Sequence, residues 1–207
     1  MLANISQRLF DNFEAKDAAR ESALKRSRNM VRLCGRAIKS IHREQNDQAK
    51  EIIAQAATIN TEIKSLLAEH PEIYYAGFVE HAQQEYAEAT ILYCILKENR
   101  IPDNTYLDVE DSAYLMGLGD VVGELRRIIL DLIRLDKPDE GEKFLEIMDE
   151  IYTTILLFDF PDALMKGLRH KGDVARSLVE RTRGDLTNAM GQDKLKEQMS
   201  KLETKLE

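Results

Sequence analysis

Two pairs of acidic residues are spaced so that a helix would place the members of each pair on one face. Glu85 and Glu88 are three residues apart, and Asp120 and Glu124 are four apart, in two separate apolar patterns of helical period. Carboxylates beside an apolar stripe are costly unless they are paired or bound to a cation. If the two helices pack antiparallel, the pairs can converge on one site. Such a cluster favours Mg²⁺ or Mn²⁺, hard cations that also bind phosphate.

A structural role for these acids stays open, because the same spacings are common on ordinary helix surfaces. The segment around Asp120 and Glu124 adds a second signal, since it holds Gly117, Gly119 and Gly123. Glycine inside a helix costs roughly 1 kcal/mol relative to alanine. The three glycines therefore predict the close approach of another backbone or a ligand.

The elements that must position these acids are all predicted to be helices. The four prolines (71, 102, 138 and 161) fall between periodic segments and never inside one. Asp108 is predicted to cap the helix that carries Asp120. Apolar spacing predicts helices near 4–44, 47–68, 71–98, 108–135, 138–158, 161–183 and 191–206. We expect an all-α, single-domain bundle of about seven helices over residues 1–207, in which 191–207 is a C-terminal helix or tail.

Basic residues are concentrated near the N-terminus. Eight bases and one acid between Arg20 and Arg43 give this segment a charge of +7, so the rest of a chain of net charge −8 carries −15. Six of the bases fall within an arc of roughly 80° on a helix, and apolar residues occupy the opposite side. This basic stripe is predicted to bind the phosphates of a nucleic acid. Its members are Lys25, Arg28, Arg32, Arg36, Lys39 and Arg43.

Two other interpretations of the basic stripe remain. It can be a solvated helix face that pairs with the acidic remainder of the chain. It can also be a membrane-surface helix, although its apolar side is poor in the aromatic residues that such helices use.

Length and composition limit the class of protein. A chain of 207 residues is one domain, or at most two very small ones. A hydrophobic fraction of 43% with 32% charged residues excludes intrinsic disorder. No apolar run approaches the ~18 residues of a membrane span, and the N-terminus lacks the pattern of a signal peptide. Both cysteines, Cys34 and Cys94, lie in apolar patterns. We expect a soluble, cytoplasmic protein with buried thiols.

Several kinds of site are excluded by missing motifs. The chain has no Glu-x-x-His of di-iron bundles, no zinc-ligand spacing, no dinucleotide-binding glycine motif and no P-loop. His81 precedes Glu85 by one turn and either joins the acidic site or is an ordinary, partly buried histidine. Leu195, Met199, Leu202 and Leu206 form a short heptad-like seam that predicts a docking helix.

Three segments together resemble the translin superfamily, and within it the Trax (translin-associated factor X) branch. They are Gln84-Glu-Tyr-Ala-Glu-Ala, Leu107-Asp-Val-Glu-Asp and the stretch Tyr114–Arg127 with its Gly-x-x-Asp-x-x-Gly-Glu order. The resemblance spans roughly residues 20–185. It implies an all-α fold of about seven helices, a closed, octamer-like shell and binding of single- or double-stranded RNA and DNA.

For the Trax branch, the resemblance also implies a Mg²⁺-dependent endoribonuclease. Carried over residue by residue, the catalytic carboxylates are Glu85, Glu88 and Asp120, and Glu124 is a further metal ligand. This chain is shorter than that branch and lacks its long insertion before the Tyr-Leu-x-Gly motif. Contacts to a separate translin partner are therefore not implied by the resemblance, and a homo-oligomer is the simpler expectation.

The expected function is binding of short RNA, and of single-stranded DNA, on the basic stripe, with cleavage at a carboxylate-bound Mg²⁺ or Mn²⁺. The first alternative is a non-catalytic RNA- or DNA-binding scaffold of the same fold, in which the acids are structural. A purely structural helical oligomer is the second.

Overall fold

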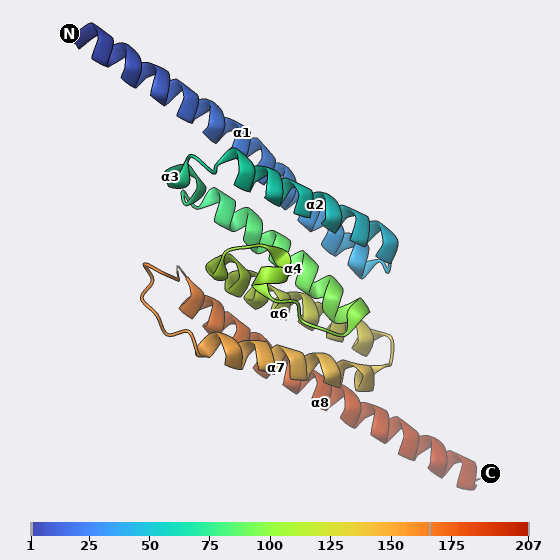
Figure 1. Ribbon diagram of the computed structural model, residues 1–207. Coiled ribbons are helices and arrows are strands. Elements are labelled where there is room, and N and C mark those ends of the chain that lie inside the picture. Colours follow the sequence, from blue (N-terminus) through green and yellow to red (C-terminus); the bar gives the residue numbers. More distant parts are fainter. Residues whose placement is uncertain (1, 166, 207) are drawn as a thin grey trace. The chain divides into compact units, whose positions relative to one another are not determined.

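The computed structural model describes residues 2–165 and 167–206. These residues form eight α-helices and one 3₁₀ helix without any strand, which confirms the all-α fold class (Figure 1). The helices group into two compact units, Met1–Gly117 and Leu118–Glu207. A single domain over residues 1–207 remains a prediction.

The first unit is built around three long helices. Helices α1 (Leu2–His42), α2 (Asn46–Leu66) and α4 (Phe78–Glu98) pack on one another (Figure 1). The short helix α3 (Pro71–Tyr74) lies between α2 and α4 in the chain, and the short helix α5 (Asn104–Leu107) follows α4. Apolar residues with helical spacing supply the core because they fall on the inner face of each helix. Examples that are at most 1% exposed are Met30 of α1, Ile63 of α2 and Ile91 of α4.

Two details of the predicted helices in this unit are wrong. The helix expected over 71–98 is divided, because Gly77 has a φ of 95° and separates α3 from α4. A positive φ cannot continue a right-handed helix and suits glycine. Asp108 is not an N-cap: it ends α5 with a φ of 55°, and α6 (Asp111–Arg134) begins three residues later. Asp103 is the N-cap of the short helix α5, and its Oδ1 accepts a hydrogen bond of 2.7 Å from the Tyr106 amide.

The second unit contains α6 from Leu118 onward, the 3₁₀ helix η1 (Pro138–Gly141), α7 (Glu142–Leu156) and α8 (Leu168–Leu206), and α7 packs along α8 (Figure 1). Its core includes Ile129 and Met148, both fully buried. The two helices expected over 161–183 and 191–206 are one continuous helix, α8. Leu186 lies between the two predicted helices and is fully buried. It packs against Gly141, where a Cβ would lie 2.9 Å from Leu186 Cδ2. A helix over 191–206 is thus present, as the last turns of α8.

No helix among the described residues is both long enough and apolar enough to cross a membrane.

Candidate nucleic-acid interface and carboxylate site

The basic stripe lies on the outer face of α1. All six of its residues are exposed, whereas the opposite face is buried. Arg32 donates a hydrogen bond of 2.8 Å to Asn29 Oδ1. None of the six forms an ion pair with any residue in the described part of the chain, although the neighbouring Arg26 pairs with Glu62 at 3.0 Å. The stripe is therefore a row of cations that forms no ion pair with an acidic side chain in the described part of the chain. The buried opposite face is formed by Met30, Leu33, Cys34, Ala37, Ile38 and Ile41.

The first acidic pair lies on α4, on the side toward α1. Glu88 is 9% exposed, and the side chain of Glu85 is 26% exposed. His81 Nε2 lies 4.0 Å from Glu85 Oε1, one turn away. The thiol of Cys34 is close enough to interact with both carboxylates: burial first, and then the negative charges of Glu85 and Glu88, raise its pKa above the ordinary value. The two acids thus approach the buried face of the helix whose outer face carries the basic stripe.

Gly117 explains how α6 approaches this acidic pair. A Cβ on Gly117 would lie 2.6 Å from the Gln84 carbonyl oxygen, 2.9 Å from Ala87 Cβ and 3.0 Å from the Glu88 amide nitrogen. The start of α6 therefore packs directly on the backbone of α4 at the turn that carries Glu85 and Glu88. This contact confirms the predicted close approach of another backbone at the glycine-rich segment.

A buried polar network holds the connection that leads into α6. The Gln83 side chain is fully buried, and it donates to Asn60 Oδ1 and to the Tyr74 hydroxyl, both at 3.0 Å. Its own oxygen accepts a hydrogen bond of 3.3 Å from the Glu110 amide, and Asn60 donates to the Asp108 carbonyl at 2.8 Å. A satisfied buried network of this kind rigidifies its surroundings. Residue spacing does not predict this network, because a polar residue within an apolar pattern does not indicate which distant residue it will bond.

The second acidic pair lies on α6, in the second unit. Asp120 Oδ1 accepts a hydrogen bond of 2.5 Å from Lys171 Nζ of α8. Gly119 makes room for that lysine, since a Cβ there would overlap its Cγ. Glu124 Oε2 lies 3.8 Å from an Arg127 guanidinium nitrogen, and its side chain is 23% exposed. Lys171 is a site residue that sequence reasoning missed, although Gly119 was a signal that a side chain must pass there.

The donor chemistry of the four acids fits a hard cation, since all of them offer carboxylate oxygens. Glu85 and Glu88 belong to the first unit, and Asp120 and Glu124 to the second. The described residues contain no group of three or more His, Cys, Asp or Glu side chains that could hold a metal ion. A metal site that all four share remains a prediction.

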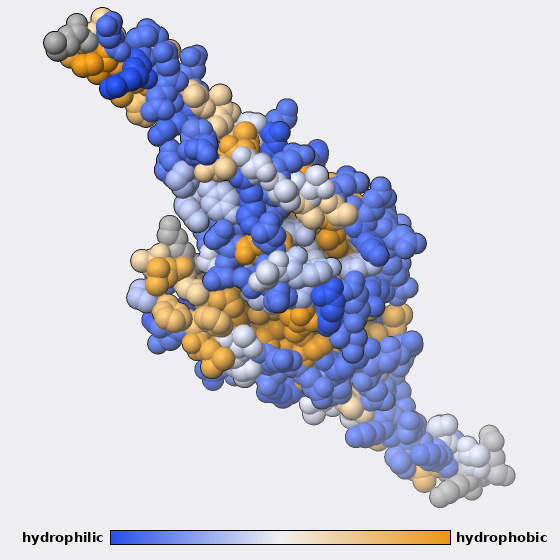
Figure 2. Space-filling view, in the orientation of Figure 1, coloured by the Kyte–Doolittle hydropathy of each residue, from blue (hydrophilic) through white to orange (hydrophobic). Residues whose placement is uncertain are grey.

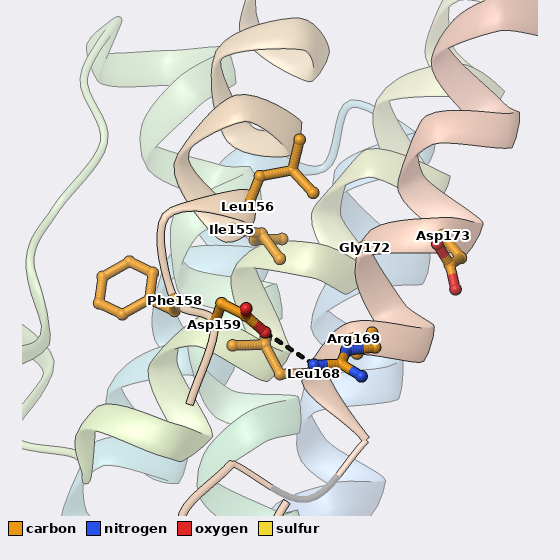
Figure 3. Close-up of a pocket in the computed structure, with 8 residues that line it drawn as sticks. All are labelled: Ile155, Leu156, Phe158, Asp159, Leu168, Arg169, Gly172 and Asp173. Carbon is orange, nitrogen blue, oxygen red and sulfur yellow. Dashed lines mark hydrogen bonds and ion pairs between the residues drawn. The ribbon is translucent and has the colours of Figure 1, made fainter. Parts of the chain in front are cut away.

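A small pocket opens in the second unit where α7 ends and α8 begins (Figure 3). It encloses about 290 Å³, and Ile155, Leu156, Phe158 and Leu168 supply its apolar lining. Asp159 accepts a hydrogen bond of 2.7 Å from Arg169 beside it. Residue spacing does not predict this pocket, because its walls come from a loop and two helices.

Comparison with known proteins places the chain in a family. No family profile matches it. The chain is 35% identical over 191 residues to the uncharacterized protein MJ0175 of Methanocaldococcus jannaschii, and the match covers 91% of this chain and 84% of that protein. It superposes on the crystal structure of AfC3PO with a TM-score of 0.83 at 33% identity, over 93% of this chain and 98% of that one. AfC3PO is a protein of the translin superfamily. The chain belongs to this superfamily.

Two further structures define the translin-superfamily fold of this chain. AfC3PO has also been solved as a complex with duplex RNA, which matches with the same TM-score at 32% identity. Apo-NeC3PO matches over 91% of this chain and 98% of its own with a TM-score of 0.81; at 24% identity this likeness concerns the fold alone. The fold and superfamily implied by the sequence segments are thereby confirmed.

Proposed function

We propose that this translin-superfamily protein is a Trax-like, Mg²⁺-dependent endoribonuclease. The observation that carries the proposal is the arrangement around α1. Its outer face presents six cations without acidic partners among the described residues, and its buried face adjoins Glu85 and Glu88 at Cys34. A phosphate-binding surface and an acidic pair therefore belong to opposite sides of one helix, which is about 10 Å thick.

The basic stripe would hold the RNA backbone without reading its sequence, because phosphate contacts position a nucleic acid but do not specify it. The solved complex of AfC3PO with duplex RNA supports RNA as the ligand class. Single-stranded DNA carries the same phosphate chemistry and is expected to compete for the stripe.

The proposed metal ligands are Glu85, Glu88, Asp120 and Glu124. These are the four acids that match the motifs by which the chain resembles the Trax branch, and all of them offer carboxylate oxygens. Mg²⁺ or Mn²⁺ bound there would lower the pKa of a water molecule and neutralise charge on the scissile phosphate. The protein itself supplies oriented carboxylates and, on α1, the cations that hold the strand.

Assembly into a homo-oligomer, as an octamer-like shell, belongs to the same proposal. The first turns of α1 expose a row of apolar side chains, and orange atoms lie among blue ones at this end of α1 (Figure 2). An exposed apolar row of this length is typical of an interface. Its residues are Leu2, Ile5, Leu9, Phe10 and Phe13.

A cleavage assay tests the function. A labelled short RNA is incubated with the protein in Mg²⁺, in EDTA, and with Glu85→Gln in Mg²⁺. We expect cleavage by the wild type alone, while all three samples retain RNA binding in a gel-shift assay. Cleavage in EDTA, or at the wild-type rate by Glu85→Gln, would contradict the proposal.

A non-catalytic RNA-binding scaffold is the second candidate, and one observation favours it. Asp120 is already paired with Lys171, so one of the four acids has a structural partner. In the same assay, a scaffold binds RNA in all three samples and cleaves it in none.

A further inference from the structure

Lys171 and Asp120 form an ion pair that lies largely out of solvent. Lys171 Nζ is 2.5 Å from Asp120 Oδ1, and the two side chains are 20% and 27% exposed. At this depth an ammonium and a carboxylate interact more strongly than on an open surface. A cation that binds Asp120 must therefore displace the Lys171 ammonium or share the carboxylate with it.

The residues around Lys171 leave space for its side chain to reach Asp120. Its aliphatic stem crosses α6 at Gly119, where a Cβ would overlap Lys171 Cγ and lie 3.3 Å from Ile155 Cδ1 of α7. Only a residue without a side chain leaves this passage open. Glycine in a helix interior lowers the stability of the helix by roughly 1 kcal/mol relative to alanine. The space for the lysine stem therefore comes at the expense of helix stability.

The position of Lys171 in its own helix is also unfavourable. It lies in the first turn of α8, which begins at Leu168, and that turn contains no acidic residue. The partial positive charge of a helix N-terminus repels a cation. Asp120 is the group that offsets this repulsion.

A purely mechanical role, tying α8 to α6, is already served by another residue. Arg126 of α6 donates to Thr182 Oγ1 and pairs with Asp185, both at 2.8 Å. Thr182 is fully buried, and the Arg126 side chain is 20% exposed, like that of Lys171. The helices thus have a polar tie that does not involve Asp120.

We propose that Lys171 is the resident counter-cation of Asp120, a positioning residue that competes with the divalent metal for this carboxylate. The inference rests on the proposed function, because it takes Asp120 as a metal ligand. In the metal-free protein the ammonium neutralises and holds Asp120. A divalent ion must displace or share it, and this lowers the affinity of the site for metal.

Mn²⁺ binding in the absence of RNA tests this competition. Free Mn²⁺ is measured by electron paramagnetic resonance in titrations of wild type, Lys171→Met, Lys171→Arg and Asp120→Asn. Removing the competing charge should tighten Mn²⁺ binding by on the order of tenfold, whereas Lys171→Arg keeps the charge and stays close to wild type. Asp120→Asn should weaken binding. Arg126→Met is the matched control: it removes a cation of equal exposure and should leave Mn²⁺ affinity within about twofold of wild type.

Gly119→Ala gives a second route should Lys171→Met fold poorly. The added methyl group obstructs the lysine stem without deleting the charge, so Mn²⁺ binding should tighten in the same direction. Unchanged or weaker Mn²⁺ binding by Lys171→Met, alongside weakened binding by Asp120→Asn, would overturn the role of Lys171 and leave the proposed metal site intact. Mn²⁺ binding that Asp120→Asn does not weaken would overturn the metal ligand itself.

Discussion

A methyl group added to Gly117 would stand 2.6 Å from the carbonyl oxygen of Gln84, so these two residues mark a close approach of α6 to α4. Backbone atoms cannot yield as a flexible side chain can. We therefore expect Gly117→Ala to lower the free energy of unfolding by about 2 kcal/mol, because the overlap outweighs the gain in helix propensity. Urea denaturation measures this difference.

Gly123→Ala is the control for Gly117→Ala. The same helix carries both glycines, but a Cβ on Gly123 would meet no atom of residues 2–165 and 167–206 within 4 Å. This variant should be more stable than wild type by up to about 1 kcal/mol. Equal effects of the two substitutions would show that α6 does not pack on α4 through Gly117.

Cleavage should depend on the acidic pair of α4 while folding does not. We expect Glu85→Gln and Glu88→Gln to abolish cleavage and to keep RNA affinity within about twofold of wild type. Their thermal stability without metal should stay level or rise, since each removes one of two neighbouring negative charges. Glu51→Gln, an exposed acid of α2, is the matched control and should cleave normally. Unfolding of either variant would show that these acids are structural.

Asp120 differs from Glu85 and Glu88 in the effect that its substitution should have on the stability of the protein. We expect Asp120→Asn to abolish cleavage as well, but to lower the melting temperature, because Lys171 is then left without its partly buried partner. Differential scanning calorimetry checks this. A melting temperature equal to that of wild type would mean that the ion pair contributes nothing to stability.

The basic stripe is tested through the salt dependence of RNA binding. Replacing Arg28, Arg32 and Arg36 together by Gln should weaken binding of unrelated sequences equally. The slope of log affinity against log salt should fall by roughly 0.7–0.9 for each phosphate that the variant no longer neutralises. Three exposed arginines of α8 changed to Gln serve as the control, and they should leave the slope unchanged; these are Arg176, Arg181 and Arg183. An unchanged slope in the stripe variant would mean that these residues only solvate α1.

Cys94 gives a pH dependence of stability. Burial, and then the negative charge of Glu98, raise the pKa of this thiol from 9.0 to about 11. The folded state therefore holds the proton more tightly than the unfolded state does. The resulting stability is present below about pH 9 and disappears as the pH rises through 11, by about 3 kcal/mol in all. Cys94→Ala should lose less stability over this range in urea denaturation than wild type; an identical loss would contradict the assignment.

Assembly is tested by the mass in solution. We expect light scattering at low micromolar concentration to give a multiple of 23.7 kDa. Charging the apolar row with Leu9→Asp and Phe13→Asp should reduce that mass, because a buried charge opposes association. A wild-type mass near that of one chain would rule out a shell of subunits.

Much of this protein could be predicted from local sequence pattern. Apolar spacing predicts that the basic stripe of α1 faces outward and that the apolar residues opposite it, from Met30 to Ile41, face inward. Both faces lie as expected. Glycine at 117 predicts a close backbone contact, and that contact is with α4. These predictions succeed because the period of a helix converts residue spacing directly into a face.

The tertiary structure decided what spacing cannot express. The break at Gly77 and the continuity of α8 past Gly184 differ although both segments contain glycine, because Gly77 has a φ of 95° whereas Gly184 lies within the α-helix. The pairing of Asp120 with Lys171 joins residues 51 positions apart. Such contacts depend on how side chains from distant helices meet, and helical period describes only one helix at a time.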